Sequence, residues 1–208
     1  MKFRSIAAAA ASAGLLFACS NRPSPQAATS AQTLTILAPL FPHDPDGRFC
    51  VANELRPPLE DQRRSGAFNR LSWVDRLKSM FVSRPSSQPS DWYQSGPKGE
   101  ELRLQRRDAE HLEDFLRKAV YADLPTEKVR LTLPEGMRAC SDSDTKVGPS
   151  GATPRIALYF SQPVVVGNIA FVEQGGVCGN LCGSGHLVSL IKRNGQWTLL
   201  ARRMTWIA

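Results

Sequence analysis

The sequence contains few of the residues and motifs on which catalytic and cofactor-binding sites are commonly built. Only three histidines occur, His43, His111 and His186, so a histidine-based catalytic pair has few candidates. There is no G-x-S-x-G motif, no phosphate-binding P-loop, no dinucleotide-binding glycine pattern and no H-E-x-x-H motif. The sequence therefore favours a non-catalytic protein without a cofactor or metal, although this lack of motifs does not by itself exclude an enzyme.

Internal repeats, heptads and membrane-spanning apolar runs are also absent from the sequence. The hydrophobic content of 42% and the charged content of 22% are ordinary for a globular protein, which argues against disorder along the whole chain. The formal net charge of +7 is modest, and its lysines and arginines are scattered rather than clustered. We therefore expect no nucleic-acid partner, and this charge instead suits a protein held near an anionic surface.

The N-terminal segment has the layout of a signal peptide. Lys2 and Arg4 form a short basic region, and the apolar run from Ile6 to Ala18 follows it. This run is too short to cross a bilayer but suits a secretory signal. We therefore assign residues 1–18 to a cleaved signal peptide.

The signal ends in the residues Leu16-Phe17-Ala18-Cys19, which resemble a bacterial lipobox. The resemblance implies cleavage before Cys19 and attachment of a diacylglycerol to its sulfur, although Phe17 replaces the small residue usual in that family. Ser20, in a place where aspartate would favour the inner membrane, implies the periplasmic side of the outer membrane. The alternative is an ordinary secretory signal that leaves Cys19 free. Residues 19–33 are polar and rich in proline, which predicts a flexible tether between the membrane anchor and the fold.

Four further cysteines, Cys50, Cys140, Cys178 and Cys182, are expected to form two disulfides in an oxidising compartment. Of the three pairings we favour Cys50–Cys140 and Cys178–Cys182. On the chain-entropy model the long loop would stabilise the protein by roughly 4–5 kcal/mol and the short one by about 2 kcal/mol.

A functional alternative uses the same glycine- and cysteine-rich stretch, residues 175–186. Cys178, Cys182 and His186 recur at four-residue steps, so they could ligate a metal, or the two cysteines could act as a redox pair. Structural zinc sites have tighter cysteine pairs and a fourth ligand, so a structural disulfide remains the favoured interpretation.

Residues 34–208 are predicted to form a single domain. Its first apolar run, Thr33 to Phe41, is expected to be a strand that ends at Pro42. The following Asp44 and Asp46 resemble calcium ligands, but no further ligands come at loop spacing, so a turn is favoured.

Two helices are expected before the C-terminal strands. Apolar residues at three- and four-residue steps predict the first between 68 and 81, and they predict a longer one from Glu100 to Asp123. In the longer helix, Glu113 is expected to pair with Arg117 one turn later. Its apolar face consists of Ala109, Leu112, Phe115, Leu116 and Ala119.

The segments between and after these helices are assigned from turn residues and alternation. A long loop is expected at 83–99, where Trp92 and Tyr93 either pin the loop to the core or stack on a sugar or peptide. Alternation at 129–133 predicts a short strand, and 135–155 is expected to be loop.

The last fifty residues, 156–208, are predicted to form an antiparallel meander of four strands. Pro163 should interrupt its first strand, and Asn194-Gly195 should form a type I′ turn, which needs positive φ at both positions. The alternation changes phase at Arg202 and Arg203, which predicts one β-bulge.

This order of elements predicts an α+β fold in which one or two amphipathic helices cover one face of the meander. The arrangement is similar to the nuclear-transport-factor-like architecture, which also ends in a meander. The function expected from the whole sequence is that of a lipid-anchored cell-envelope protein, a binding or structural module that contacts an envelope protein or the cell wall. The alternative is a periplasmic redox or metal-dependent protein that uses Cys178, Cys182 and His186.

Overall fold

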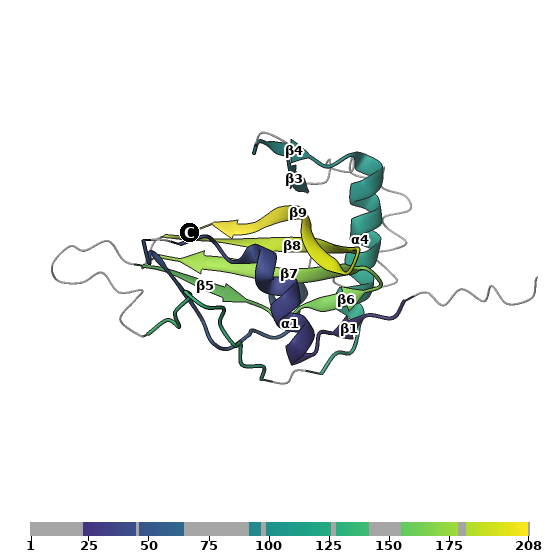
Figure 1. Ribbon diagram of the computed structural model, residues 1–208. Helices are drawn as coiled ribbons and strands as arrows, with labels where there is room; N and C mark the ends of the chain where they lie inside the picture. The colour runs from purple at the N-terminus through teal and green to yellow at the C-terminus, as the bar shows by residue number, and fades with distance from the viewer. Residues whose placement is uncertain are drawn as a thin grey trace, which may run out of the picture.

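The protein is an α+β fold built on one large, mainly antiparallel sheet (Figure 1). The computed structural model describes residues 23–44, 46–64, 92–96, 99–125, 128–141, 155–178 and 182–207. The predicted signal peptide, Cys19 and the helix expected between 68 and 81 lie outside these described residues.

The predicted meander forms the centre of the sheet. Its strands are β5 (Ile156–Phe160), β6 (Val164–Val166), β7 (Ile169–Val177), β8 (Gly183–Arg193) and β9 (Gln196–Ile207). Both β5 and β6 pair with the same side of β7, so they are two halves of one strand that is interrupted around Pro163, as the sequence predicts.

The turns of the meander also follow the sequence. Asn194 and Gly195 have φ values of 50° and 83°, which confirms a turn with positive φ at both positions. The β9 strand is less regular than expected, because it carries two register shifts against β8 rather than one. The extra residues are Leu200 and Thr205, and they flank the predicted position at Arg202 and Arg203.

The glycine- and cysteine-rich stretch at 175–186, whose composition predicts a loop between two strands, is mostly strand. β7 continues through Gly175 and Gly176, and β8 starts at Gly183, so the two strands pair almost to the cysteines. The backbone N–H of Cys178 donates to the carbonyl of Cys182 at 2.9 Å and closes the end of this hairpin.

The N-terminal region contradicts two expectations. The apolar run at 33–41 belongs to a helix, α1 (Ser30–Leu37), and to the 3-10 helix η1 (Ala38–Leu40), not to a strand. Thr29 caps α1 by accepting a hydrogen bond from the backbone N–H of Gln32, whose side chain bonds the Thr29 N–H in return. Ahead of α1, β1 (Gln26–Ala27) pairs with β6, so the sheet already begins within the segment expected to be a tether.

The next strand, β2 (Phe49–Val51), pairs with β5 in parallel. On its other side lies the extended segment 128–141, which forms isolated bridges to it and to the chain that follows, rather than the strand expected at 129–133. The predicted disulfide between Cys50 and Cys140 joins the two segments, with Cα atoms 4.8 Å apart.

The long helix is shorter at its N-terminus than the sequence predicts. Residues Glu101–Arg103 form strand β4, which makes a hairpin with β3 (Tyr93–Ser95), and the helix α4 spans Arg106–Tyr121. β3 reaches β9 through a single pair, Tyr93 with Arg202. A further short helix, α2, spans Glu60–Arg64.

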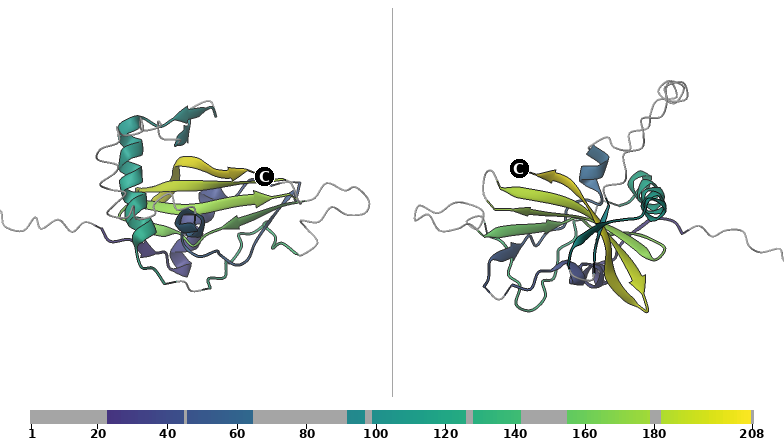
Figure 2. Two further views of the ribbon diagram at one scale, coloured as in Figure 1. Left: turned by 180° about the vertical axis from the view of Figure 1, so that it is seen from behind. Right: turned by 90° about the horizontal axis from the view of Figure 1, so that it is seen from above.

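The apolar side chains of the sheet alternate between two hydrophobic clusters, one on each face. Both faces are therefore covered. Figure 2 shows α4 on one side of the sheet and α1 on the other, and we call these sides the α4 face and the α1 face. On β7, Ile169 and Phe171 point to the α4 face, whereas Ala170 and Val172 point to the α1 face. The α4 residues predicted to be apolar are buried against the first cluster, apart from the half-buried Phe115.

Candidate functional site

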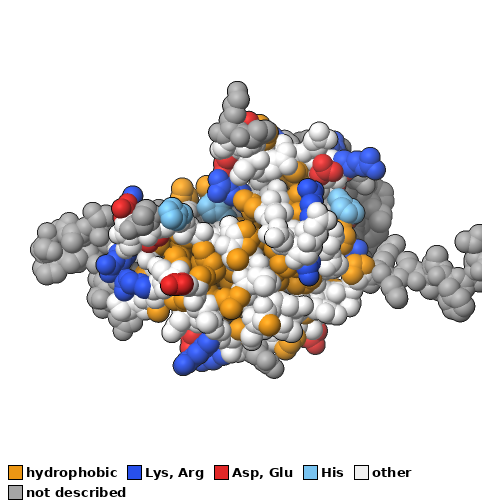
Figure 3. All heavy atoms as spheres, viewed as in Figure 1, with side chains coloured by type: hydrophobic (Ala, Val, Ile, Leu, Met, Phe, Trp, Pro, Cys, Tyr) orange, Lys and Arg blue, Asp and Glu red, His pale blue; other side chains and the backbone are white. Residues whose placement is uncertain are grey.

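A groove opens on the α1 face at the end of the sheet where β7 and β8 carry their glycines. We call it the end groove, and its volume is about 550 Å³. Figure 3 shows hydrophobic side chains gathered across this face of the molecule, with basic side chains at its left edge. The lining includes the apolar Phe49, Ile156, Leu158 and Ile207, the disulfide of Cys178 and Cys182, and the polar Gln174, Ser184, His186 and Arg202.

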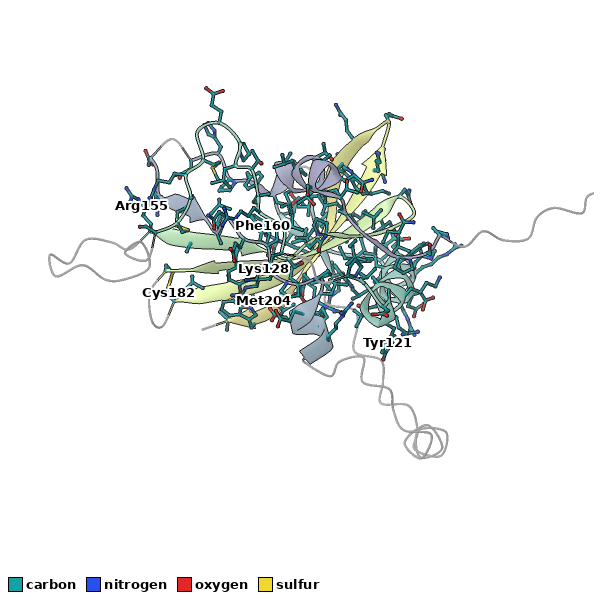
Figure 4. All side chains as sticks on the ribbon, turned by 90° about the horizontal axis from the view of Figure 1, so that it is seen from below. Tyr121, Lys128, Arg155, Phe160, Cys182 and Met204 are labelled. Atoms are coloured by element: carbon teal, nitrogen blue, oxygen red, sulfur yellow. A yellow bond between two sulfur atoms is a disulfide. The ribbon has the colours of Figure 1, made fainter. Side chains whose placement is uncertain are left out.

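A second hollow of about 470 Å³ continues past the disulfide. It shares Ile156, Cys178 and Cys182 with the end groove and is bounded by Arg48 and Arg155, with Asp46 beside them. Figure 4 shows Arg155 and Cys182 at the same end of the sheet. The combined surface is therefore apolar along its walls and basic at its outer mouth.

The polar side of the end groove is produced by strand register. His186 lies opposite Gln174 on β7, so their two side chains project from the same face of the sheet. Burial lowers the pKa of His186, the nearby Arg202 guanidinium lowers it further, and Glu101 opposes them. The imidazole is therefore neutral at pH 7 and can both donate and accept a hydrogen bond.

The predicted site residues Cys178, Cys182 and His186 do meet in this groove, but not as a metal centre. The two cysteines form a disulfide with Cα atoms 5.1 Å apart, as the favoured pairing predicts. Among the described residues, no group of three or more His, Cys, Asp or Glu side chains could hold a metal ion. Near the groove mouth, the Asp44 carboxylate accepts hydrogen bonds from the backbone N–H groups of Arg48 and Phe49, which confirms the expected turn.

On the α4 face of the same strand ends, two aromatic rings cover the glycines. Tyr159, Gly175, Gly185 and Trp206 form one row across β5, β7, β8 and β9. A Cβ atom on Gly175 would overlap the Tyr159 ring, and a Cβ on Gly185 would overlap the Trp206 indole. The glycines are therefore needed for close packing of aromatic rings on a strand, not for a loop.

Next to this row lies a buried carboxylate, Glu173, which is only 4% exposed. It accepts hydrogen bonds from the backbone N–H groups of Asp61 and Gln62 in α2, at 3.1 and 2.8 Å. Burial raises the pKa of Glu173 to about 7, against the effect of these two hydrogen bonds and with some help from the charges of Asp61 and Glu60.

A second polar cluster fixes the fully buried Trp92. Of the loop expected at 83–99, residues 83–91, 97 and 98 lie outside the described residues, and Tyr93–Ser95 form a strand instead. The Trp92 indole N–H donates to the Glu113 carboxylate at 2.7 Å, and the same carboxylate pairs with Arg203 of β9. Arg203 also lies over the Trp92 ring and donates to the Gln62 side chain. The predicted pair of Glu113 with Arg117 is thus wrong, and Arg117 pairs with Asp114 instead.

Gln174, Arg202 and Phe49 were not identified from the sequence as groove residues. Gln174 on β7 pairs with His186 on β8, so their side chains lie on the same face of the sheet. Alternation along each strand predicts the face of each side chain but not this pairing. Phe49 enters through the parallel pairing of β2 with β5, and no local pattern signals that contact.

Comparison with protein-family models, with curated proteins and with solved structures found no match. Within the described residues, no helix has the length and apolarity required to cross a membrane. The resemblances to a lipobox and to the nuclear-transport-factor-like architecture therefore stay predictions.

Proposed function

We propose that the protein is a lipid-anchored, non-catalytic binding module of the cell envelope. Its ligand in the end groove would be an amphipathic molecule with an apolar body and an acidic head group. The observation that carries this proposal is the groove itself, where apolar walls face a few convergent polar groups. Such a combination is the usual composition of small-molecule sites.

The charges around the groove favour an acidic head group. Arg48 and Arg155 bound its outer mouth, and Arg202 lines its inner end, whereas Asp46 is the acidic residue in its lining. We place the head group at the outer mouth, because two arginines stand together there and one lines the inner end. The apolar body would then lie against Leu158 and Ile207, with the neutral His186 and Gln174 free to bond a polar group along it.

The absence of a reactive pair supports binding rather than catalysis. Among the described residues, no hydrogen bond joins His186 to Ser184 or to a carboxylate, and both groove cysteines are bonded to each other. Nucleophilic catalysis needs a base within hydrogen-bond reach of its nucleophile.

The ligand is tested with a fluorescent long-chain carboxylate, a dansyl-labelled undecanoic acid, titrated into the mature protein. Ser184→Trp places an indole in the end groove and should weaken binding at least tenfold. Thr198→Trp, on the exposed part of β9, is the matched control and should leave binding unchanged. The proposal is contradicted if the unmodified protein does not bind the probe, or if both variants bind it with the same affinity.

The anchor is tested separately by the intact mass of the native protein. A diacyl modification on Cys19, and its loss with release from the membrane in Cys19→Ser, are expected. An unmodified chain cut before Cys19 would contradict lipidation without affecting the groove.

A second candidate function is thiol–disulfide exchange at the Cys178–Cys182 disulfide, which we propose only because this disulfide lines the groove. A thiol carried by a bound substrate would there lie close to the sulfurs. Selective reduction of Cys178–Cys182 by a small thiol in the folded protein would favour this function, whereas resistance of this disulfide to the thiol would argue against it.

A further inference from the structure

The indole of Trp206 lies flat on the sheet, on the face opposite to the end groove. Its ring covers two glycines of β8 that share this face, since a Cβ on Gly183 would lie 3.1 Å from the ring and one on Gly185 would overlap it. The ring is therefore seated directly on strand backbone, which holds its orientation. An indole has only two rotatable side-chain bonds, so little conformational freedom remains to be lost when a ligand binds.

The surroundings of this ring differ from those of the other described tyrosine and tryptophan rings on or beside the sheet. Cations lie over the rings of Tyr93, Tyr159, Trp92 and Trp197. Trp206 is partly exposed, and among the described residues no cation–ring or ring–ring contact involves it. It also belongs to neither of the two hydrophobic clusters. One side of the indole is thus fixed to the protein, and the side chain keeps part of its surface exposed.

Hydrogen-bonding groups stand at the edge of the open ring. The Tyr159 hydroxyl interacts with both Trp206 and Arg56, and Asp61 is close enough to affect its titration. The Arg56 guanidinium lies 3.5 Å from the centre of the Tyr159 ring. The Arg56 backbone N–H donates a hydrogen bond to the Phe160 carbonyl, and its carbonyl accepts one from the Gln162 N–H. A hydroxyl, a guanidinium and a carboxylate therefore adjoin one flat apolar surface.

We propose that Trp206, with Tyr159 and Arg56 at its edge, forms a stacking platform for a sugar ring of a glycan. A pyranose ring presents an apolar face of C–H groups, which packs on the negative face of an indole, and a rim of hydroxyls that both donate and accept hydrogen bonds. The neighbouring groups match that rim. A nucleic acid fits less well, because the negative charge of Asp61 acts at the same edge as Arg56.

This site is independent of the proposed groove ligand. The groove opens on the α1 face and the platform lies on the α4 face, so the two ligands would not compete. Failure of either site leaves the other untouched, and the two assays use different probes.

The experiment measures binding of the mature protein to insoluble chitin and purified peptidoglycan by co-sedimentation, and to chitohexaose by calorimetry. Trp206→Leu keeps apolar cover over the glycines but removes the flat ring, and it should weaken binding at least tenfold. Tyr159→Phe, which removes only the hydroxyl, should weaken binding about two- to fivefold. Trp197→Leu, on the same strand but over Lys192 on the α1 face, is the matched control and should bind like the unmodified protein.

Thermal unfolding of each variant separates loss of binding from loss of fold. The proposal is overturned if the unmodified protein binds none of the three glycans, or if folded Trp206→Leu binds as tightly as the control. It is also overturned if binding is equally reduced in Trp197→Leu, or if a proline-rich peptide binds to Trp206 while the glycans do not.

Discussion

The carboxylate of Glu173, in the middle of β7, accepts a hydrogen bond from the backbone N–H of Gln62, 2.8 Å away. Gln62 in turn accepts a hydrogen bond from Arg203 through its side chain, at 3.1 Å. One residue of the short helix α2 therefore links the buried carboxylate of β7 to the partly buried Arg203 of β9. The protonation state of Glu173 therefore affects the hydrogen bonds that hold α2 against the sheet.

The stability of the protein should fall as the pH rises from about 4.5 to about 8. The folded state raises the pKa of Glu173 from 4.5 to about 7, so it binds this proton more tightly than the unfolded state does. Stability from this group is therefore complete below the unfolded pKa and is lost as the pH passes through the folded pKa. The loss amounts to at most about 3.5 kcal/mol, at roughly 1.4 kcal/mol per pKa unit.

Urea unfolding at several pH values measures this effect. Glu173→Gln should remove most of the pH dependence. Glu135→Gln, which removes an exposed carboxylate, should leave it in place. Identical pH profiles for Glu173→Gln and the unmodified protein would show that another group is responsible.

Replacement of Glu113 by alanine should destabilise the protein by about 2–3 kcal/mol. It leaves the Trp92 indole N–H and the Arg203 guanidinium without their shared acceptor in a partly buried place. Asp114→Ala, which breaks the exposed pair with Arg117 on the same helix, should cost less than about 0.5 kcal/mol. Chemical denaturation compares the two, and equal effects would contradict a structural role for the buried cluster.

Gly185→Ala should destabilise the protein by about 1–3 kcal/mol, because the new methyl group would meet the Trp206 indole. In the Trp206→Ala background the same change should cost far less, since the ring is gone. Gly176→Ala is the control on the opposite face, where the methyl group would lie 3.3 Å from Ile156. Thermal unfolding of this double-mutant cycle checks the coupling, and additive effects would show that the ring does not limit position 185.

The two disulfides should differ in their contributions. Cys50–Cys140 spans 90 positions and Cys178–Cys182 spans 4. On the chain-entropy model their removal costs roughly 4–5 and about 2 kcal/mol. Urea unfolding of Cys50→Ala/Cys140→Ala and of Cys178→Ala/Cys182→Ala gives the comparison. A larger loss from the short ring would indicate that native contacts at the hairpin end outweigh the loop entropy.

Local patterns predicted those parts of the fold that depend on neighbours in the sequence. Three features could be predicted because each arises within about ten residues. They are the alternation along β7 to β9, the turn at Asn194-Gly195 and the apolar face of α4. The helix α1 was also readable in principle, since Thr29 and Gln32 have capping-box spacing. The apolar run that follows them instead led to the prediction of a strand, which is wrong.

The remaining features depend on contacts between distant segments. Glycines at 175, 183 and 185 suggest a loop until Tyr159 and Trp206 are known to lie over them. Glu113 selects Arg203, 90 positions away, over the nearer Arg117, because the sheet brings that guanidinium to a less exposed place. The groove is likewise completed by Phe49, which arrives through a parallel strand pair.

The pairing of β1 with β6 and of β2 with β5 also determines when the protein can fold. Gln26 lies opposite Val165, and Cys50 lies opposite Ala157, so both N-terminal strands take their places only against strands from the last third of the chain. Contacts over such separations form slowly, because the intervening loop must close before any pairing compensates for it. A nascent chain therefore remains without its complete sheet until synthesis is nearly finished.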